Sequence, residues 1–353
     1  MTDSTTRPIG IAVAGLGPQG RMLARAIATE VPGAALAAVI DLDADLLREV
    51  GEELAAPESS SLADVLTWDH TDAVVIATPT STHGPLVREA IAAGKPIFLE
   101  KPVSLDWREG VEILDLAIAE GVLVQVGLHC RFDHDFRAVK DLAAGGRLGS
   151  PYYFRAVLRD METPDDLSFL ASTGSLLVDA TLHDIDLAAW LIDAPVVEVT
   201  AIATSVSDPA FAEAGDMDWV TVTLRFAGGA LAVLETARVA GYGFEHAIEL
   251  IGSKGGARIG GGTIDGVEHL TPGLRGRELV SSHLQRHAGA YRAELREFAA
   301  RVRNGERGVV YGAEAMTAFS LAKVAEQAID AASTLRVVPE TTGPWTRYVV
   351  AAD

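Results

Sequence analysis

The sequence predicts an α/β chain of two domains. The first is an N-terminal doubly wound Rossmann domain, and the second is a C-terminal α+β domain with a large open, mostly antiparallel sheet. In the first 128 residues, short apolar runs alternate with amphipathic stretches, the pattern of βαβ units around a parallel sheet. After about residue 150, strand-like segments follow one another with few helices between them. We therefore predict domains at residues 1–128 and 129–353, and 353 residues are enough for both.

The strands of the first domain are short apolar runs bounded by Gly, Pro, Asp or Thr. Such runs are typical of strands buried on both faces. They lie at residues 9–14, 35–40, 73–77, 97–99 and 122–127. The amphipathic stretches between them predict helices at 18–30, 43–55, 83–93 and 106–119.

The second domain shows the two-residue alternation of strands with one face on a core. The residues Val220, Val222 and Leu224 alternate with threonines, and Gly228-Gly229 predicts a hairpin turn. The predicted strands are 152–158, 196–204, 220–226, 230–237 and 247–251. The predicted helices are 176–192, 284–304 and 312–332.

Composition excludes several classes of function. The net charge of −20 argues against general affinity for nucleic acid, because phosphate binding requires a basic face. No apolar stretch approaches the 18 residues of a membrane span, and no secretory signal is recognisable, so we expect a cytoplasmic protein. The single cysteine, Cys130, cannot form an intrachain disulfide, and no oxyanion motif supports it as a nucleophile.

A glycine-rich loop follows the first strand and opens the first helix. It reads Gly15-Leu16-Gly17-Pro18-Gln19-Gly20, the fingerprint that places a pyrophosphate on a helix N-terminus. Asp41 ends the next strand, where a carboxylate binds ribose hydroxyls and repels a 2′-phosphate. The alternative is that Asp41 only caps the following helix. We expect NAD rather than NADP.

The third strand ends in small polar residues, and such residues line the ligand crevice of open α/β sheets. We expect the segment Thr78-Pro79-Thr80, with His83, to meet the nicotinamide half of the cofactor. Thr82 is alternatively a cap for the helix that begins at His83.

Lys101 lies between Glu100 and Pro102, directly after the apolar run at 97–99. A parallel strand would deliver this lysine into the crevice, whereas an isolated surface lysine is usually only solvated. Asp179 and His183, four residues apart in a predicted helix, share one face. A carboxylate beside an imidazole fixes the orientation of the ring and adjusts its pKa for proton transfer. The alternative is that His183 has only a structural role.

No metal site is predicted for the Asp179 pair, because a third and a fourth ligand with convincing spacing are missing. The segment Gly252-Ser253-Lys254-Gly255-Gly256 suggests a phosphate loop but lacks its full pattern. We interpret it as a turn between strands.

Together these motifs resemble the glucose–fructose oxidoreductase/inositol dehydrogenase family of NAD(P)-dependent oxidoreductases, closest to its inositol 2-dehydrogenase-like branch. The resemblance covers most of the chain. Besides the glycine loop and Asp41, it rests on Ala77-Thr78-Pro79, Gly94-Lys95-Pro96, Glu100-Lys101-Pro102, Arg131-Phe132-Asp133, Arg159-Asp160, the stretch from Gly174 to Asp186, and Ala290-Tyr291-Arg292-Ala293-Glu294.

The resemblance implies that Lys101, Asp179 and His183 form the catalytic set. His183 would take the hydroxyl proton, Lys101 would stabilise the developing alkoxide, and Asp179 would position either the substrate hydroxyl or His183. The cofactor-binding residues would be Gly15, Gly17, Pro18, Gln19, Gly20, Asp41, Thr78, Pro79, Thr80, His83, Glu100 and Lys101.

The chain departs from the family pattern where substrate specificity is expected to be set. Leu128-His129-Cys130 precedes Arg131, and His287 lies where an aromatic residue is common. The predicted substrate-binding residues are His129, Arg131, Arg159, His287 and Tyr291.

We therefore expect NAD-dependent oxidation of a secondary alcohol of a cyclic polyol or sugar, by a homodimer or homotetramer. One alternative is an NAD(P)H-dependent reductase of a keto-sugar or a related carbonyl. A second alternative is a non-catalytic sugar or dinucleotide sensor on the same fold.

Overall fold

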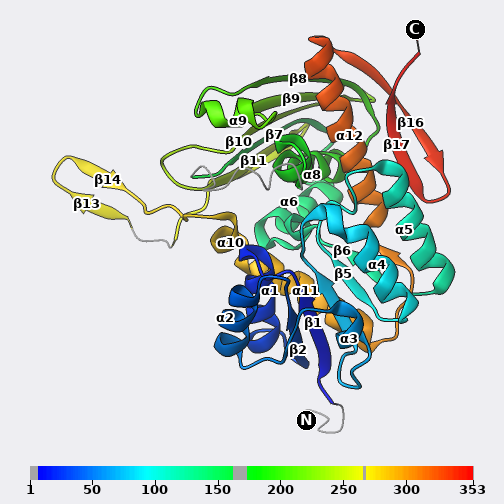
Figure 1. Cartoon of the computed structure of the whole chain (residues 1–353). Helices are drawn as coiled ribbons and strands as arrows, with labels where there is room; N and C mark the ends of the chain where they lie inside the picture. The colour runs from blue at the N-terminus through cyan, green and yellow to red at the C-terminus, as the bar shows by residue number, and fades with distance from the viewer. Residues whose placement is uncertain (1–6, 162–172, 265–267, 353) are drawn as a thin grey trace. The chain divides into compact units, whose positions relative to one another are not determined.

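The computed structural model describes residues 7–161, 173–264 and 268–352. The chain forms two compact units (Figure 1). The first unit comprises Met1–His129 and Ala290–Ala315, and the second comprises Cys130–Gly289 and Met316–Asp353. The predicted second domain is continuous, 129–353. The structure instead assigns the segment Ala290–Ala315 to the first unit.

The first unit is built on a seven-stranded sheet in which all neighbours are parallel, in the order β15-β6-β5-β4-β1-β2-β3. The strands are β1 (Ile9–Ala14), β2 (Ala34–Ile40), β3 (Glu58–Ser59), β4 (Ala73–Ile76), β5 (Ile97–Leu99), β6 (Val124–Val126) and β15 (Val309–Val310). The five predicted strands are confirmed. The two-residue strand β15 adds to the edge beside β6, which explains why 290–315 belongs to this unit.

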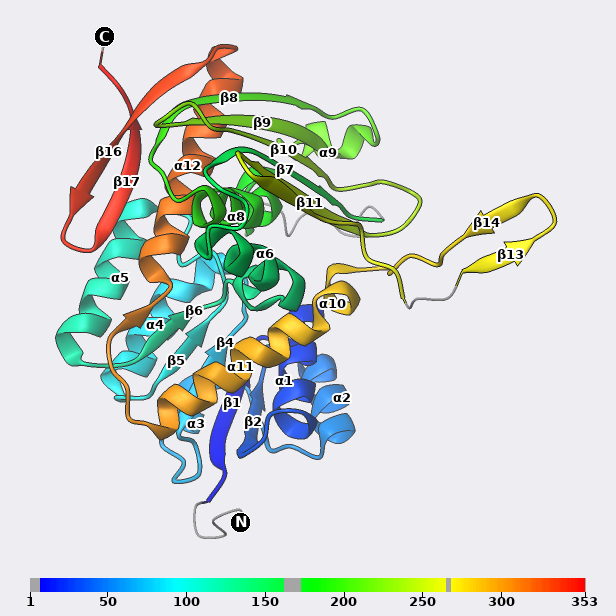
Figure 2. The same ribbon diagram turned by 180° about the vertical axis from the view of Figure 1, so that it is seen from behind.

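Helices between the strands cover this sheet, as predicted. They are α1 (Pro18–Thr29), α2 (Ala44–Leu54), α3 (Leu62–Leu66), the 3₁₀ turn η1 (Thr80–Thr82), α4 (His83–Ala92) and α5 (Trp107–Glu120). Local sequence sets their ends: Asp106 caps the start of α5, and Gly121 ends it with a φ of 63°. Figure 2 shows α11 (Ala288–Arg303) lying across the parallel sheet.

The second unit contains an eight-stranded sheet in the order β12-β11-β7-β10-β9-β8-β16-β17, in which only β7 and β10 pair in parallel. The strands are β7 (Pro151–Arg159), β8 (Val196–Thr204), β9 (Trp219–Phe226), β10 (Leu231–Ala237), β11 (Glu245–Gly252), β12 (Gly255–Ile259), β16 (Leu335–Thr342) and β17 (Trp345–Val350). The open, mostly antiparallel sheet is confirmed. Ser253 and Lys254 form the predicted turn, here between β11 and β12.

Three helices, α6 (His134–Ala144), α8 (Leu182–Ile192) and α12 (Gly312–Ala331), lie on the same side of this sheet (Figures 1 and 2). The strand side chains that face the core are apolar. Val220, Val222 and Leu224 of β9 are fully buried, whereas the intervening Thr221 and Thr223 are half-buried. The predicted alternation is therefore confirmed.

The remaining elements are short. They are the 3₁₀ turn η2 (His129–Phe132), the π-helical turn η4 (Leu177–Thr181), α9 (Pro209–Glu213), β13 (His269–Thr271), β14 (Leu274–Gly276) and α10 (His283–Arg286). The predicted helix at 284–304 is divided into α10 and α11 at His287. Across the described residues, no helix combines the length and apolarity that a membrane span requires.

Candidate active site

The glycine loop has the geometry of a phosphate cradle. Gly15 has a φ of 89°, and a Cβ on Gly15 would lie 2.6 Å from the Ala77 carbonyl, so this position requires glycine. A Cβ on Gly20 would lie 1.8 Å from the Gly15 oxygen, whereas a Cβ on Gly17 would meet nothing within 4 Å. The helix α1 begins at Pro18 without a side-chain cap. Its first backbone N–H groups are therefore suited to an anionic ligand above Gly17.

Asp41 braces this loop. Its Oδ2 accepts a hydrogen bond from the Leu16 N–H at 2.7 Å, and its Oδ1 accepts one from the Asp43 N–H at 3.0 Å. The N-cap of α2 is Asp43, whose carboxylate accepts from the N–H groups of Asp45 and Leu46. The alternative that Asp41 only caps this helix is therefore wrong. The Asp41 carboxylate lies beside the glycine loop, as the ribose prediction requires.

The Glu100-Lys101-Pro102 segment is joined to the same loop. The Gln19 Nε2 donates a hydrogen bond to Glu100 Oε1 at 3.0 Å. Burial raises the pKa of the Glu100 carboxyl, while the Lys101 charge and the Gln19 hydrogen bond act in the opposite direction. Lys101 is half-buried and follows directly in the chain.

The strand order explains why these residues converge. The strands β4 and β5 lie on one side of β1, and β2 lies on the other side. The chain therefore reverses direction across the sheet between β1 and β4. Ligands of open α/β sheets bind at such a switch point, outside the carboxyl ends of the strands. The glycine loop, Thr78 and Lys101 follow the carboxyl ends of β1, β4 and β5 respectively.

The Thr78 segment is held by its own hydroxyl groups and by His83. The Thr82 hydroxyl lies 2.7 Å from both Thr78 Oγ1 and the Pro79 oxygen, and it makes no side-chain cap for α4. The two ring nitrogens of the buried His83 lie 2.9 Å from the Pro102 oxygen and 3.0 Å from the Thr78 oxygen. Burial lowers the pKa of His83. His83 thus joins the two loops, and a direct cofactor contact from it stays a prediction.

In the second unit, Asp179 and His183 lie on one continuous helical segment, Asp179 in η4 and His183 in α8. The predicted helix is confirmed, but its first turn is π-helical, which changes the angle between positions four residues apart. Asp179 Oδ2 accepts a hydrogen bond from Arg238 at 3.1 Å, and Arg238 also pairs with Asp216 at 2.8 Å. Arg238 is 59 residues from Asp179, and no local pattern predicts this contact.

Two predicted substrate residues of the first unit stack on each other. The rings of His129 and Tyr291 lie 4.4 Å apart at an interplanar angle of 29°. One turn further along α11, Glu294 Oε1 accepts a hydrogen bond from the Leu128 N–H at 2.7 Å. Burial, reinforced by the charge of Glu100, raises the pKa of the Glu294 carboxyl well above its usual value. Glu294 thus binds α11 to the residues that follow β6.

The two predicted substrate arginines are engaged in ion pairs of the second unit. Arg131 donates two hydrogen bonds of 2.8 Å to Asp186. Arg159 donates to Tyr242 at 2.7 Å and forms salt bridges with Glu235 and Glu245. Their polyol contacts stay predictions, and such contacts would compete with these pairs.

His287 also lies in the second unit, where it belongs to a buried chain of polar side chains. Its Nε2 lies 2.9 Å from His246 Nδ1, and its Nδ1 lies 3.2 Å from Asp133 Oδ2. Burial lowers the pKa of His287 to about 3.

Burial and the charges of the neighbouring carboxylates raise the pKa of the Cys130 thiol well above its usual value. A neutral thiol is a weak nucleophile, which agrees with the sequence-based interpretation.

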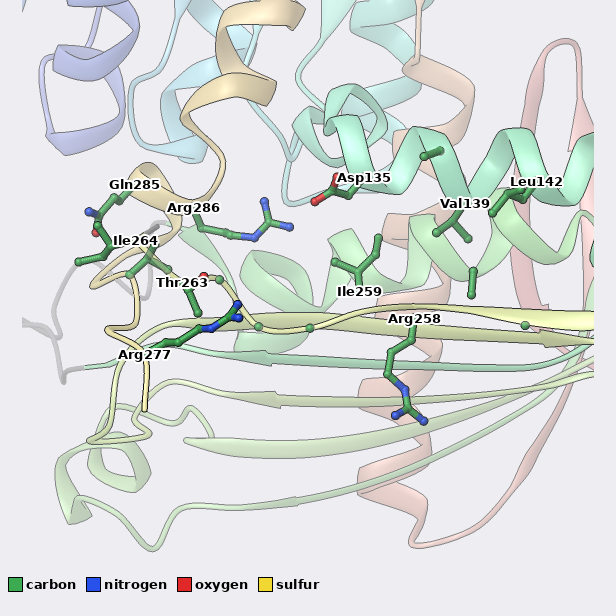
Figure 3. Close-up of a pocket in the computed structure, with 17 residues that line it drawn as sticks. Asp135, Val139, Leu142, Arg258, Ile259, Thr263, Ile264, Arg277, Gln285 and Arg286 are labelled. Carbon is green, nitrogen blue, oxygen red and sulfur yellow. The ribbon is translucent and has the colours of Figure 1, made fainter. Parts of the chain in front are cut away.

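A hollow of about 890 Å³ lies in the second unit, between α6 and the segment that includes β12 and the loop after it (Figure 3). Its lining includes Asp135, Val139, Ile259, Arg277 and Arg286. None of the residues predicted from the sequence to bind cofactor or substrate lines this hollow.

Comparison with known proteins assigns the family. Residues 9–128 match the oxidoreductase family with an NAD-binding Rossmann fold, and residues 136–258 match the GFO/IDH/MocA C-terminal domain. The chain is 32% identical to the myo-inositol 2-dehydrogenase of Thermotoga maritima, covering 91% of this chain and 96% of the relative. It is 33% identical to the scyllo-inositol 2-dehydrogenase (NAD(+)) of Bacillus subtilis, covering 85% and 87% respectively.

A solved structure extends this similarity to three dimensions. The scyllo-inositol dehydrogenase of Lactobacillus casei, with bound NAD(H) and scyllo-inositol, matches with a TM-score of 0.85 at 25% identity. The match covers 93% of this chain and 99% of that protein. With both domain families matched and the cofactor loop in place, the chain belongs to the GFO/IDH/MocA family of oxidoreductases, with an NAD-binding Rossmann domain.

Proposed function

We propose that the protein oxidises a secondary alcohol of a cyclic polyol, such as an inositol, with NAD as the acceptor. The observation that carries the proposal is the gathering of the glycine loop, Asp41 and Lys101 at the carboxyl edge of one parallel sheet. The relatives named as inositol 2-dehydrogenases align over most of the chain, which supports the substrate class.

The residues present fit a dinucleotide. Gly15 and Gly20 permit the tight loop, and the open space above Gly17 and the uncapped start of α1 suit a pyrophosphate. Asp41 suits the ribose hydroxyls. When bound, NAD accepts the hydrogen of the alcohol carbon together with its bonding electron pair.

The residues of the chain have the remaining tasks. The imidazole of His183 takes the hydroxyl proton as the carbonyl forms. The Lys101 ammonium group donates a hydrogen bond to the same oxygen and stabilises the negative charge that develops on it. Such stabilisation is larger in a cleft with little water than in bulk solvent.

Asp179 has a positioning role in this proposal. The Arg238 guanidinium holds the Asp179 carboxylate in one orientation, and the buried Arg238 is itself anchored on Asp216, whose side chain is 5% exposed. A carboxylate held in this way can orient the substrate hydroxyl or the His183 ring. Polyol hydroxyls would be recognised by His129 and Tyr291. Arg131 and Arg159 would join them by exchanging their ion pairs for substrate contacts. His287 is left out of this set, because it is buried and its two ring nitrogens face His246 and Asp133.

Assembly and location complete the proposal. The face of the antiparallel sheet opposite α6, α8 and α12 carries half-buried side chains such as Thr221, Thr223 and Val233. We propose that this face mediates a homodimer or homotetramer, which analytical ultracentrifugation would distinguish. A cytoplasmic location, where the enzyme would meet the NAD pool, belongs to the same proposal.

The direct test is NADH formation over a panel of inositols and aldoses at mildly alkaline pH, where release of the proton favours oxidation. The expected result is turnover with at least one inositol and with NAD rather than NADP. The Lys101→Met variant serves as the inactive control. Turnover only with keto-sugars and NAD(P)H would show that the protein is a reductase instead. NAD binding without turnover of any substrate would indicate a non-catalytic sensor instead.

A further inference from the structure

Three potential metal ligands converge in the interior of the second unit. The ligand atoms of Cys130, His246 and His287 lie within 4.8 Å of one another, and all three residues are buried. They come from η2, from β11 and from the junction after α10, so that only the fold brings them together. Thiolate and imidazole are the ligands that zinc prefers in proteins.

Both histidines are oriented by carboxylates in the way that metal-binding histidines usually are. His246 Nε2 lies 2.9 Å from Asp184 Oδ1, and His287 Nδ1 lies 3.2 Å from Asp133 Oδ2. A ring nitrogen that faces a carboxylate carries the proton, which directs the lone pair of the other nitrogen toward a metal. In both rings that other nitrogen is the one that faces the neighbouring histidine, His246 Nδ1 facing His287 Nε2.

A count of hydrogen atoms shows that this series of contacts is one hydrogen short when both imidazoles are neutral and both carboxylates are ionised. Three contacts link Asp184, His246, His287 and Asp133 in series, and each needs one hydrogen. Two neutral imidazoles supply only two. The third contact therefore needs either one more proton on one of these four groups or a metal ion between His246 Nδ1 and His287 Nε2, which are 2.9 Å apart.

The surrounding charges suit a divalent cation. Binding of the ion would displace the thiol proton of Cys130, and the resulting thiolate with the carboxylates of Asp133 and Asp184 supplies three negative charges. A divalent ion and the Arg286 guanidinium, 2.8 Å from Asp133 Oδ2, would neutralise all three. Asp184 Oδ2 is buried and has no hydrogen-bond partner among the described residues.

We propose that Cys130 Sγ, His246 Nδ1 and His287 Nε2 form a binding site for one zinc-type divalent ion. At zinc–nitrogen distances of about 2.0–2.1 Å, tetrahedral geometry separates the two nitrogens by about 3.3 Å, so the rings need to move apart only slightly. Because all three ligands are buried, the role is structural: the ion joins η2, β11 and the end of α10.

Arg286 connects the carboxylate that orients His287 to the hollow of the second unit. Arg286 binds Asp133 and also lines the hollow of the second unit, where it extends from α10 toward α6 (Figure 3).

The test uses the full-length protein without an affinity tag. After treatment with a chelator, the protein is titrated with Co²⁺ and then with Zn²⁺. We expect saturation at roughly one ion per chain, with visible bands of tetrahedral cobalt and a thiolate-to-cobalt charge-transfer band. Zinc should displace the cobalt and raise the melting temperature. An absence of stoichiometric binding would overturn the proposal and assign a shared proton to the two rings.

Variants identify the ligands. Cys130→Ser should lose the charge-transfer band, and Asp184→Asn, which changes only the orienting carboxylate, should weaken zinc binding about 10–100-fold. His134→Gln is the matched control, because His134 is an exposed histidine at the start of α6. Its zinc affinity should equal that of the wild type. A charge-transfer band that persists in Cys130→Ser, or affinity lost equally in His134→Gln, would contradict the assigned ligands. Should Cys130→Ser fail to fold, the wild-type spectrum and Asp184→Asn decide the question.

Discussion

Replacement of Asp41 by asparagine should relax the preference for NAD over NADP. Asp41→Asn keeps an oxygen that can accept from the Leu16 N–H, 2.7 Å away in the wild type, but it removes the negative charge. A hydrogen bond from a ribose hydroxyl to a charged group contributes about 1.5–3 kcal/mol, so NAD affinity should fall about 10–150-fold.

The affinity for NADP should rise in Asp41→Asn, because the repulsion between the carboxylate and the 2′-phosphate is removed. Two unit charges 4 Å apart interact by about 4 kcal/mol at an effective dielectric constant of 20, and a 2′-phosphate beside Asp41 experiences repulsion of this order. Removing the carboxylate should therefore change the NAD to NADP affinity ratio by at least about 100-fold.

Titration calorimetry with each dinucleotide measures this ratio without a known substrate. Asp43→Asn is the matched control, because it makes the same charge change two residues away, and asparagine still caps α2. Asp41→Ala should in addition leave the Leu16 N–H without its acceptor, at a cost of about 1–3 kcal/mol in stability. An unchanged affinity ratio in Asp41→Asn would refute the assignment of this carboxylate to the ribose.

Three further predictions concern catalysis and stability. Lys101→Met should lower kcat/KM by at least about 10²-fold while NAD affinity stays within a factor of a few, and an active variant in steady-state assays would remove Lys101 from the mechanism. Because burial raises the pKa of Glu294 above 4.5, the folded state keeps a proton that the unfolded chain releases. The contribution of Glu294 to stability should therefore fall by up to about 1.4 kcal/mol per pH unit as the pH rises from 4.5 to its raised folded-state pKa. Glu294→Gln should remove this loss in denaturant titrations, and parallel pH profiles for the two proteins would contradict the assignment. Arg238→Met should destabilise the protein by about 3–5 kcal/mol, because it removes the guanidinium that pairs with the shielded side chain of Asp216 and with Asp179, and Asp216→Asn should restore part of the loss.

Most of the fold could be predicted because its signals are local. The apolar runs that form β1, β4 and β5 are buried on both faces, and the residues between them have helical periodicity. The elements that were missed lack such signals. The strands β3 and β15 have two residues each, and β16 exposes most of its polar side chains.

The cofactor side of the site could likewise be predicted from the sequence. Parallel strands end at one edge of the sheet, so Gly15, Thr78 and Lys101 had to lie near one another once their strands were recognised. The helix of Asp179 and His183 also followed from local periodicity, apart from its π-helical first turn.

The tertiary structure alone decided the partners of the charged side chains. Arg238 approaches Asp179, and His246 approaches Asp184, across 59 and 62 residues of sequence. No spacing rule predicts such pairs, because they form only where strands of one sheet pack against a helix from another part of the chain. The sequence by itself predicted a dinucleotide site at the edge of the parallel sheet and located the lysine that follows β5 at that edge. Only the tertiary structure decided which histidines and carboxylates are buried together, because the cost of burying charge is settled by contacts distant in the sequence.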